Sequence, residues 1–510
     1  MLLHDIAAAW RDVAATSGRG AKVGRLSSVL SAAHPEEVEI AVALLIGRPR
    51  QGRLGVGPAA IGRAWPNQSA ATPTLTLVET DTAIERIKGI GGAGSTDARL
   101  RALRGLLERG TAVEQQFLRA LLYGELRQGA LEGVMLDAVA RASDIDPTVV
   151  RRAHMFVGDL PRVAREAKTG GEPALRGSTV SLFRPLQPML AQSADAIDEA
   201  WPEHGAVIDY KFDGARIQVH KRNDDVRAYS RKLRDVSASI PEVIEFVRAL
   251  PADELVLDGE TLAVNQDARP LPFQVTMRRF GSRLDVGRLR QELPLHTVAF
   301  DVLYRDGAPL VDLPLTERLR QLDRLVPERH RAPRLETNDA DQAGAFLRQA
   351  LETGHEGVMI KTLDATYDAG RRGGAWTKIK PAHTLDLVVL AADWGHGRRR
   401  GWLSNLHLGA RDEATGQFVM LGKTFKGMTD QMLTWQTERL QQLAVAHDNY
   451  TVQVRPELVV EIAFNDVQTS SNYPGGVALR FARVKRYRGD KLAEDADTLE
   501  AVRRLLPAGQ

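Results

Sequence analysis

The chain has 510 residues, which is too long for one core and predicts about three domains of ordinary size. Its 68 Lys and Arg nearly balance its 65 Asp and Glu, so any affinity for a polyanion must come from local basic clusters. The absence of cysteine excludes disulfides, thiolate zinc sites and cysteine nucleophiles, and it is typical of a reducing, cytoplasmic environment.

The first twenty residues predict a surface helix. Asp5, Arg11 and Asp12 interrupt the apolar run that an export signal needs. No stretch reaches the roughly eighteen consecutive apolar residues of a membrane span, so we expect no membrane association.

From Met1 to about Ala167, apolar residues recur at spacings of three and four, as in Phe117, Leu118, Leu121 and Leu122. This pattern predicts a helical domain over residues 1–175. Glycine and proline between Lys168 and Pro173 predict a flexible connection to the next domain.

One glycine-rich segment, Gly89 to Gly94, satisfies the dinucleotide-binding pattern G-x-G-x-x-G. That fingerprint follows a strand, whereas residues 81–88 predict a helix, so we disfavour a Rossmann site. Gly91, Gly92 and Gly94 can instead link two helices and expose backbone N–H groups to a DNA phosphate near Ser95.

Residues 176–385 predict an α+β domain built on antiparallel sheets. Ile217 and Val219 alternate with polar residues as in a strand, whereas residues 240–250 and 343–351 predict helices. After Asp386, short apolar runs predict about five strands in a third domain, residues 386–510, which we expect to be a small closed barrel of the OB type.

Five short patches occur in fixed order through the middle domain: KFDGAR from Lys211, LDGE ending at Glu260, Phe300-Asp301, EGVMIK from Glu356 and WTKIK ending at Lys380. The first patch alone also fits a solvated lysine before an Asp-Gly turn. The other four patches follow it along the chain in a fixed order, and together the five favour a shared site.

A lysine is a nucleophile only when its amine is neutral, so something must lower the pKa of Lys211. Nearby cations would do so, and Arg216, Lys378 and Lys380 are the candidates. Glu260 and Glu356 lie at the ends of expected strands, where each could bind Mg²⁺ or a ribose hydroxyl, or could simply mark an exposed hairpin end.

Together the patches resemble the ordered nucleotidyltransferase motifs of ATP-dependent DNA ligases, RNA ligases and mRNA capping enzymes. The resemblance implies that Lys211 takes AMP from ATP and releases pyrophosphate. AMP then passes to a DNA 5′-phosphate, and the neighbouring 3′-hydroxyl displaces it to seal the nick.

The same resemblance assigns further roles to individual residues. It implies that Asp209 and Phe300 hold the adenine, the latter by stacking, and that Arg216 and Glu260 contact the ribose or the nick end. Phosphate contacts are implied for Arg231, Arg372, Lys378 and Lys380, and Mg²⁺ or Mn²⁺ binding for Glu260 and Glu356. Asp209 departs from the family pattern, because many members carry glutamate there.

The segment from Leu479 to Lys491 holds six basic residues and one acid. It fits a solvated edge strand, but it also resembles the last ligase motif, whose cations orient the β and γ phosphates of ATP. Those cations would be Arg480, Arg483, Lys485 and Lys491. Because the barrel must then close over the pocket and later rotate, we predict a hinge near residues 381–386.

The segment from Gly124 to Gly133, including Arg127, resembles the helical DNA-binding domain of cellular DNA ligases. We therefore expect a monomeric ligase that encircles nicked double-stranded DNA in replication, recombination or repair, three processes that the sequence does not distinguish. Three alternatives remain open: an RNA ligase, a capping-type enzyme, or a non-catalytic nucleic-acid-binding protein with a degenerate fold. An NAD-dependent ligase is disfavoured, because that family resembles a layout with a cysteine-rich zinc module.

Overall fold

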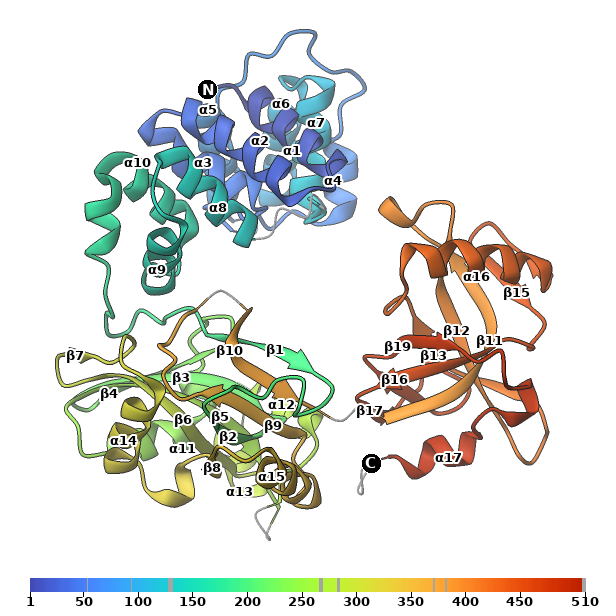
Figure 1. Ribbon diagram of the computed structural model, residues 1–510. Helices are drawn as coiled ribbons and strands as arrows, with labels where there is room; N and C mark the ends of the chain where they lie inside the picture. Colours follow the sequence, from blue (N-terminus) through green and yellow to red (C-terminus); the bar gives the residue numbers. More distant parts are fainter. Residues whose placement is uncertain are drawn as a thin grey trace. The chain divides into compact units, whose positions relative to one another are not determined.

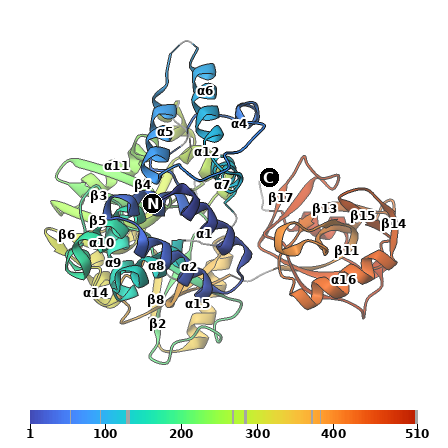
Figure 2. The same ribbon diagram turned by 90° about the horizontal axis from the view of Figure 1, so that it is seen from above.

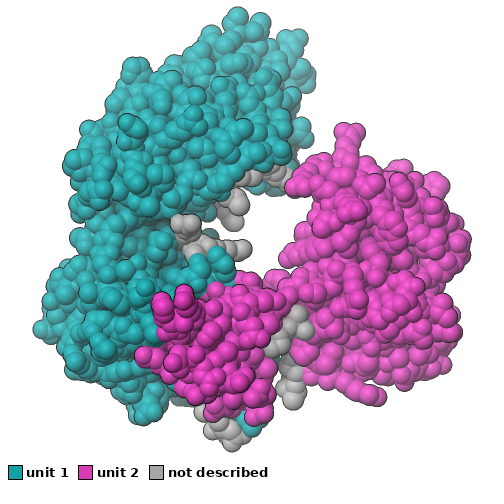
Figure 3. All heavy atoms as spheres, viewed as in Figure 1, with its two compact units in different colours: residues 1–192, 214–334, 361–376 teal, residues 193–213, 335–360, 377–510 magenta. Residues whose placement is uncertain are grey.

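The structure is a computed structural model that describes residues 1–52, 54–92, 94–126, 132–265, 269–281, 285–369, 372–380 and 383–506, without the side chains of residues 372 and 373. It forms two compact units (Figure 3). Unit 1 comprises residues 1–192, 214–334 and 361–376, and unit 2 comprises residues 193–213, 335–360 and 377–510.

Unit 1 begins with the expected helical region, coloured blue to green in Figure 1. Its helices in the described part of the chain are α1 (Leu3–Ala15), α2 (Arg19–Ala32), α3 (Pro35–Leu45), α4 (Pro58–Ala64), α5 (Leu77–Gly89), α6 (Ser95–Glu108), α7 (Ala112–Tyr123), α8 (Glu132–Ser143), α9 (Pro147–Val157) and α10 (Leu160–Arg176). Helix α7 shows the local logic: Thr111 and Glu114 form a capping box at its start, and Gly124 ends it in the left-handed conformation. Its apolar face then buries Phe117 and Leu118 in the core.

The expected flexible connection at Lys168–Pro173 is wrong, because α10 runs through these residues to Arg176. Gly171 alone leaves the helical conformation, with φ 62° and ψ −159°, and kinks the helix. Glycine tolerates this positive φ. Pro173 lies where a helix resumes, and proline is tolerated in a first turn because the N–H that it lacks would have no helical partner there.

The rest of unit 1 is built on an antiparallel sheet in the order β4-β3-β5-β6-β7. Arg216 lies opposite Glu260 in the β3–β5 ladder. Helices α11 and α12 contact this sheet, as does α14. The elements are β3 (Ala215–Arg222), β4 (Asp225–Ser230), α11 (Pro241–Arg248), β5 (Glu254–Ala263), α12 (Phe273–Phe280), α13 (Val286–Glu292), β6 (Leu295–Arg305), β7 (Ala308–Pro309) and α14 (Leu315–Leu325).

A second five-stranded sheet has the order β1-β10-β9-β2-β8. Along strands β9 and β10 the chain passes from one unit into the other. Helix α15, expected at residues 343–351, packs against β2 and buries Ala343 and Ala350. The elements are β1 (Leu190–Ala194), β2 (Ala206–Lys211), β8 (Arg334–Thr337), α15 (Ala340–Glu352), β9 (Gly357–Thr362) and β10 (Arg372–Ile379).

The C-terminal part of unit 2 is an antiparallel sheet around the long strand β11, with more strands than the five expected. Strand β11 pairs with β12 on one side and with β15 and β16 on the other. Figure 2 shows α16 beside this sheet, where it packs on β12 and β15. The elements are β11 (His383–Trp394), β12 (Leu403–Arg411), β13 (Phe418–Thr424), α16 (Asp430–Gln442), β14 (Ala444–His447), β15 (Thr451–Val454), β16 (Val459–Phe464), β17 (Asp466–Thr469), β18 (Val477–Arg480), β19 (Arg483–Tyr487) and α17 (Leu499–Arg504).

Most of the predicted hinge is regular structure. Residues His383 to Asp386 belong to β11 and pair in register with Phe464 to Glu461 of β16, so they are part of the C-terminal sheet. Pro381 and Ala382 lie outside the described residues. Among the helices of the described segments, none is long and apolar enough to cross a bilayer.

Candidate active site

Lys211 lies at the end of β2, next to β9 in the sheet. Glu356 immediately precedes β9, and its N–H donates to the Lys211 carbonyl at 3.1 Å. One Glu356 carboxylate oxygen pairs with Lys211 Nζ, and the other pairs with Lys380 Nζ. All three side chains are largely buried, with exposed fractions of 21%, 15% and 17% for Lys211, Glu356 and Lys380. The sheet therefore brings two of the predicted lysines to one carboxylate.

In this structure Glu356 is the shared counter-ion of two lysines, and its metal ligation stays a prediction. Burial raises its pKa, but the charges of Lys211 and Lys380 outweigh burial and hold the pKa below its ordinary value. An ammonium paired with a carboxylate has no lone pair to offer. Lys211 can therefore react only after another group relieves this ion pair.

Gly357 makes the close approach of β9 to β10 possible. Its φ is +145°, and a Cβ there would lie 2.1 Å from the Ile379 carbonyl oxygen. Gly214, three residues after Lys211, is similarly constrained, because its Cβ would lie 2.6 Å from the Thr261 carbonyl oxygen. The glycines in the first and fourth patches are thus required by backbone packing.

In unit 1, Arg216 is held by a buried ion pair. Its Nε and Nη2 donate to Asp258 at 3.0 and 2.6 Å, and Nη1 donates to the Met189 carbonyl at 2.7 Å. The Tyr367 hydroxyl donates to the same carboxylate at 2.7 Å. Burial would lower the pKa of Arg216, but the Asp258 charge outweighs it and raises the pKa above its ordinary value. The guanidinium is therefore fixed in place and charged.

Phe300 lies in β6 and meets Trp376 edge-on, with ring centroids 6.0 Å apart. Lys361 Nζ lies 4.9 Å from the Phe300 ring and 4.6 Å from the Trp376 ring. The residue is only 1% exposed. Sequence analysis assigned no role to Lys361, Asp258 or Tyr367. The first two lie inside the quoted patches, but only the fold reveals their burial.

Glu260 and Asp209 also lie in strands. Glu260 is inside β5, which continues to Ala263, so the expectation that it ends a strand is wrong. Asp209 is 2% exposed in β2. Lys378 lies in β10 and is half-buried, whereas Arg231 is exposed just after β4. Arg372 also lies in β10, but its side chain is outside the description.

The glycine-rich segment joins α5 to α6, as expected, so no strand precedes it and a Rossmann site is excluded. Gly92 and Gly94 have φ of +82° and +76°. The Ser95 N–H donates to the Gly92 carbonyl at 3.2 Å, so it is already engaged within the turn. Arg127 lies outside the described residues.

The predicted phosphate-orienting cations all meet carboxylates of unit 2. Arg480 lies 3.6 Å from both Asp213 and Asp466. Arg483 and Lys485 pair with Asp195 at 3.1 and 3.2 Å. Lys491 pairs with Asp386 at 2.6 Å, together with Arg488, which was not among the predicted residues.

Metal ligation was predicted for Glu260 and Glu356, which belong to different units. Within the described ranges, no group of three His, Asp or Glu side chains could hold a metal on its own. The donors fit only a metal that takes most of its ligands from water and substrate phosphates, as Mg²⁺ commonly does.

Comparison with known proteins identifies the family. The profile described as "ATP dependent DNA ligase domain" matches residues 188–380, "ATP dependent DNA ligase C terminal region" matches residues 399–491, and "DNA ligase N terminus" matches residues 59–140. A curated "Probable DNA ligase" of Anaeromyxobacter dehalogenans strain 2CP-1 is 55% identical over 510 residues, covering 99% of each chain. The chain belongs to the ATP-dependent DNA ligases.

Further relatives of this ligase agree along their whole length. The "Probable DNA ligase" of Mycobacterium marinum is 53% identical, covering 99% of this chain and 100% of its own. A solved structure named "Pmar-Lig_PreS3" is 19% identical with a TM-score of 0.62, covering 95% of this chain and 99% of its own. At that identity it confirms the fold alone. The predicted family, fold class and enzyme class are therefore confirmed.

Proposed function

We propose that this ligase seals nicks in duplex DNA through a lysyl-AMP intermediate on Lys211. The observation that carries the proposal is the shared carboxylate of Glu356, which pairs with Lys211 at the end of β2 and with Lys380 just after β10, the two strands that flank β9 in one sheet. Lys380 supplies a cation for the α-phosphate, and Lys211 supplies the nucleophile.

The chemistry proceeds in three transfers. Neutral Lys211 Nζ bonds to the α-phosphorus of ATP and releases a proton, while the bond to the bridging oxygen breaks and pyrophosphate leaves. A 5′-phosphate oxygen of the nick then bonds to that phosphorus and frees Lys211. Finally the 3′-hydroxyl attacks the 5′-phosphorus and loses its proton, and AMP leaves as the phosphodiester forms.

In this proposal the Phe300 ring stacks on the adenine, Asp209 contacts its amino group, and Arg216 and Glu260 contact the ribose. The chain itself limits how far these residues can lie from the nucleophile, because Gly214 follows Lys211 by three residues and Arg216 follows it by five. A chain of five residues spans at most about 18 Å, so the β3 residues remain near the nucleophile. Arg231, Arg372 and Lys378 are proposed to contact phosphates.

Release of the Lys211 ion pair is the step that this geometry demands. The ATP phosphates can draw Lys380 away from Glu356, and a divalent cation can occupy the carboxylate itself. Mg²⁺ or Mn²⁺ held by Glu356, with Glu260 as a second candidate, would neutralise phosphate charge when bound. The contribution of the protein is to hold Lys211 close to that carboxylate until ATP arrives.

We further propose that the helical region, as domain 1–175, binds the DNA backbone through the segment of Gly91, Gly92, Gly94 and Ser95 and through Arg127. The remaining proposed domains are residues 176–385 and 386–510, the latter an OB barrel. Such backbone contacts make binding independent of sequence and sensitive to salt. We propose a monomer in the cytoplasm, consistent with the absence of cysteine.

Two labelling reactions test the proposal. The protein is incubated with α-labelled ATP or GTP, and then with a nicked duplex whose 5′-phosphate strand is DNA or RNA. We expect label from ATP only and sealing of the DNA nick. Label from GTP would favour a capping-type enzyme, and efficient sealing of RNA alone would favour an RNA ligase. No label from either nucleotide would favour the non-catalytic alternative.

A further inference from the structure

We propose that Asp386 is a positioning residue for lysine adenylation: it holds Arg488 and Lys491 so that Lys491 meets the departing pyrophosphate in a fixed orientation. This inference rests on the proposed function, in which Lys491 orients the β and γ phosphates. It adds a carboxylate that lies outside the five patches and the basic segment. All its contacts lie within the C-terminal part of unit 2.

The contacts of Asp386 are those of a shared counter-ion. Arg488 Nη1 donates to both carboxylate oxygens, at 3.2 and 2.9 Å, and Lys491 Nζ donates to one of them at 2.6 Å. The Asp386 and Arg488 side chains are mostly buried, with exposed fractions of 10% and 16%. Lys491 is more open, at 32%. Asp386 is thus the most buried of the three side chains, and Lys491 is the most exposed.

The backbone of Asp386 is fixed from two sides. It lies opposite Glu461 in the β11–β16 ladder. Its N–H donates to the Asp497 carboxylate at 2.7 Å, and the Asp497 N–H donates back to the Asp386 carbonyl at 2.8 Å. A carboxylate on such a fixed backbone keeps its position, so it determines where the Arg488 and Lys491 side chains lie.

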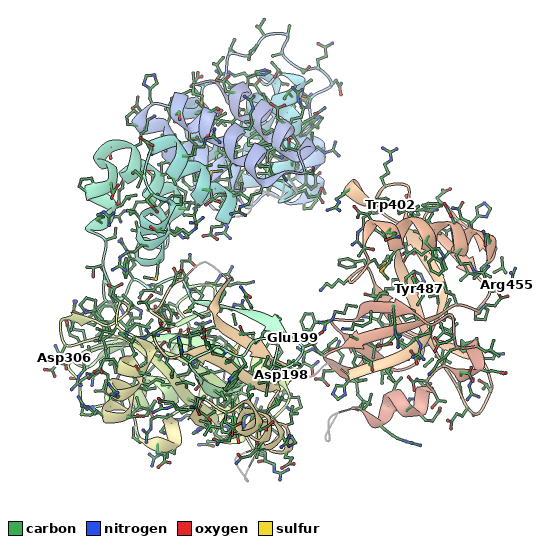
Figure 4. All side chains as sticks on the ribbon, in the orientation of Figure 1. Asp198, Glu199, Asp306, Trp402, Arg455 and Tyr487 are labelled. Carbon is green, nitrogen blue, oxygen red and sulfur yellow. The ribbon has the colours of Figure 1, made fainter. Side chains whose placement is uncertain are left out.

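The strand that leads to Arg488 is equally well held. Tyr487 ends β19, and Figure 4 labels it. Its hydroxyl donates to Gln436 of α16 at 2.7 Å, and its ring packs on Trp435 with centroids 4.7 Å apart. Arg486, one residue earlier, pairs with Glu461 at 2.7 Å. The segment therefore presents Arg488 from a rigid support.

The two cations have different freedom to meet a phosphate. Arg488 also donates from Nε and Nη2 to Asp490, at 2.9 and 2.7 Å, so carboxylates occupy most of its hydrogen-bonding positions. Lys491 has three N–H donors, and its hydrogen bond to Asp386 uses one of them. Arg488 thus acts as a fixed support, and Lys491 is the cation that can hold pyrophosphate while it is bound to Asp386.

The two directions of adenylation test this proposal. In Asp386→Asn the carbonyl oxygen remains but the charge is lost, so Lys491 is no longer held. We expect transfer of AMP from ATP to the enzyme to slow by roughly 10- to 100-fold, with a higher KM for ATP. Pyrophosphate-driven removal of AMP from the adenylated enzyme should slow by the same factor. Sealing of a pre-adenylated nick, which involves no pyrophosphate, should stay within about twofold.

Three comparisons make the test specific. Glu438→Gln removes a charge from the exposed face of α16 and should change neither direction. Lys491→Met should slow both directions, and the double variant Asp386→Asn/Lys491→Met should lose less than the product of the two single effects. Thermal unfolding of each variant monitors the fold.

Each other outcome overturns the proposal. If Asp386→Asn forms lysyl-AMP and reverses it with pyrophosphate at the parent rates, while Lys491→Met is slow in both directions, then Lys491 is important but Asp386 is not. Equal slowing of pre-adenylated nick sealing would make Asp386 merely structural. Multiplicative effects in the double variant would show that the two residues act independently. Failure of the proposed function itself would appear differently, as AMP labelling that survives Lys211→Ala.

Discussion

The carboxylate of Glu356 forms an ion pair with the ammonium of Lys211, the residue proposed to carry AMP. Its second oxygen pairs with Lys380. In the proposed mechanism this ion pair must break before Lys211 can react with ATP. We propose that ATP binding and activation of Lys211 are coupled through the Glu356 side chain.

Glu356→Gln should slow formation of lysyl-AMP on the order of 100-fold. Glutamine cannot pair with both lysines by charge, so Lys211 loses the position that sets it against the α-phosphate, and this loss outweighs the easier release of its proton. Rapid-quench measurement of AMP transfer checks this, with Glu352→Gln at the exposed end of α15 as a matched control. A normal rate in Glu356→Gln would remove the coupling role.

Gly357→Ala should abolish adenylation and destabilise the fold, because its Cβ would meet the Ile379 carbonyl oxygen at 2.1 Å. Strands β9 and β10 would have to separate, which moves Glu356 from Lys380. The matched control is Gly374→Ala, in the same strand as Ile379, where a Cβ meets nothing within 4 Å. Adenylation and thermal unfolding are measured on both. Equal behaviour of the two variants would contradict the packing argument.

Asp258→Ala should cost about 3–5 kcal/mol of unfolding free energy, because it leaves the buried Arg216 charge without its partner. Asp225→Ala removes an exposed partner of Arg227 in strand β4 and should change the unfolding free energy far less, because solvent screens this pair. Denaturant unfolding followed by a probe in unit 1 measures both. A small cost for Asp258→Ala would mean that water reaches Arg216 in the folded protein.

The order of the chemical patches made the family and the candidate nucleophile predictable from sequence. Lys211, Lys380 and Glu356 were named from motif residues, and the alternation in WTKIK already placed Lys378 and Lys380 on one face. Their ion pairs were not predictable, because they depend on β9 lying between β2 and β10, which is a long-range order of strands. The pairing of Glu356 with two lysines therefore became visible only in the fold, and its metal ligation stays a prediction.

The failed expectations have local causes. Glycine and proline at residues 170–173 predicted a linker, yet a single positive φ at Gly171 absorbs the break and the helix resumes. The predicted hinge region extends into a strand, because the β11–β16 ladder already begins at His383. Asp386 was counted within that hinge. Its partners Arg488 and Lys491 lie 102 and 105 positions later in the chain, so no short sequence motif could reveal the pairing.

The stability of unit 2 should depend on pH through His355. Burial lowers the pKa of His355 from 6.5 to about 4, and its ring packs against Tyr210 and Phe212 with centroids 5.0 Å from each. Because the unfolded state binds the proton more readily, the contribution of His355 is complete above about pH 6.5 and is lost as pH falls towards 4.

His355→Phe keeps an aromatic ring and removes the titrating group. The fall in unfolding temperature between about pH 6.5 and 4 should therefore be shallower in this variant than in the parent. Scanning calorimetry at closely spaced pH values gives the comparison. Identical slopes would show that other groups govern acid unfolding in this range.

The central claim is the covalent role of Lys211, and mass spectrometry tests it most directly. After incubation with ATP and Mg²⁺, the intact protein should gain the mass of one AMP, and peptide mapping should place it on Lys211. Lys211→Arg keeps the charge and should gain nothing. An adduct on another residue, or one that persists in Lys211→Arg, would contradict the account.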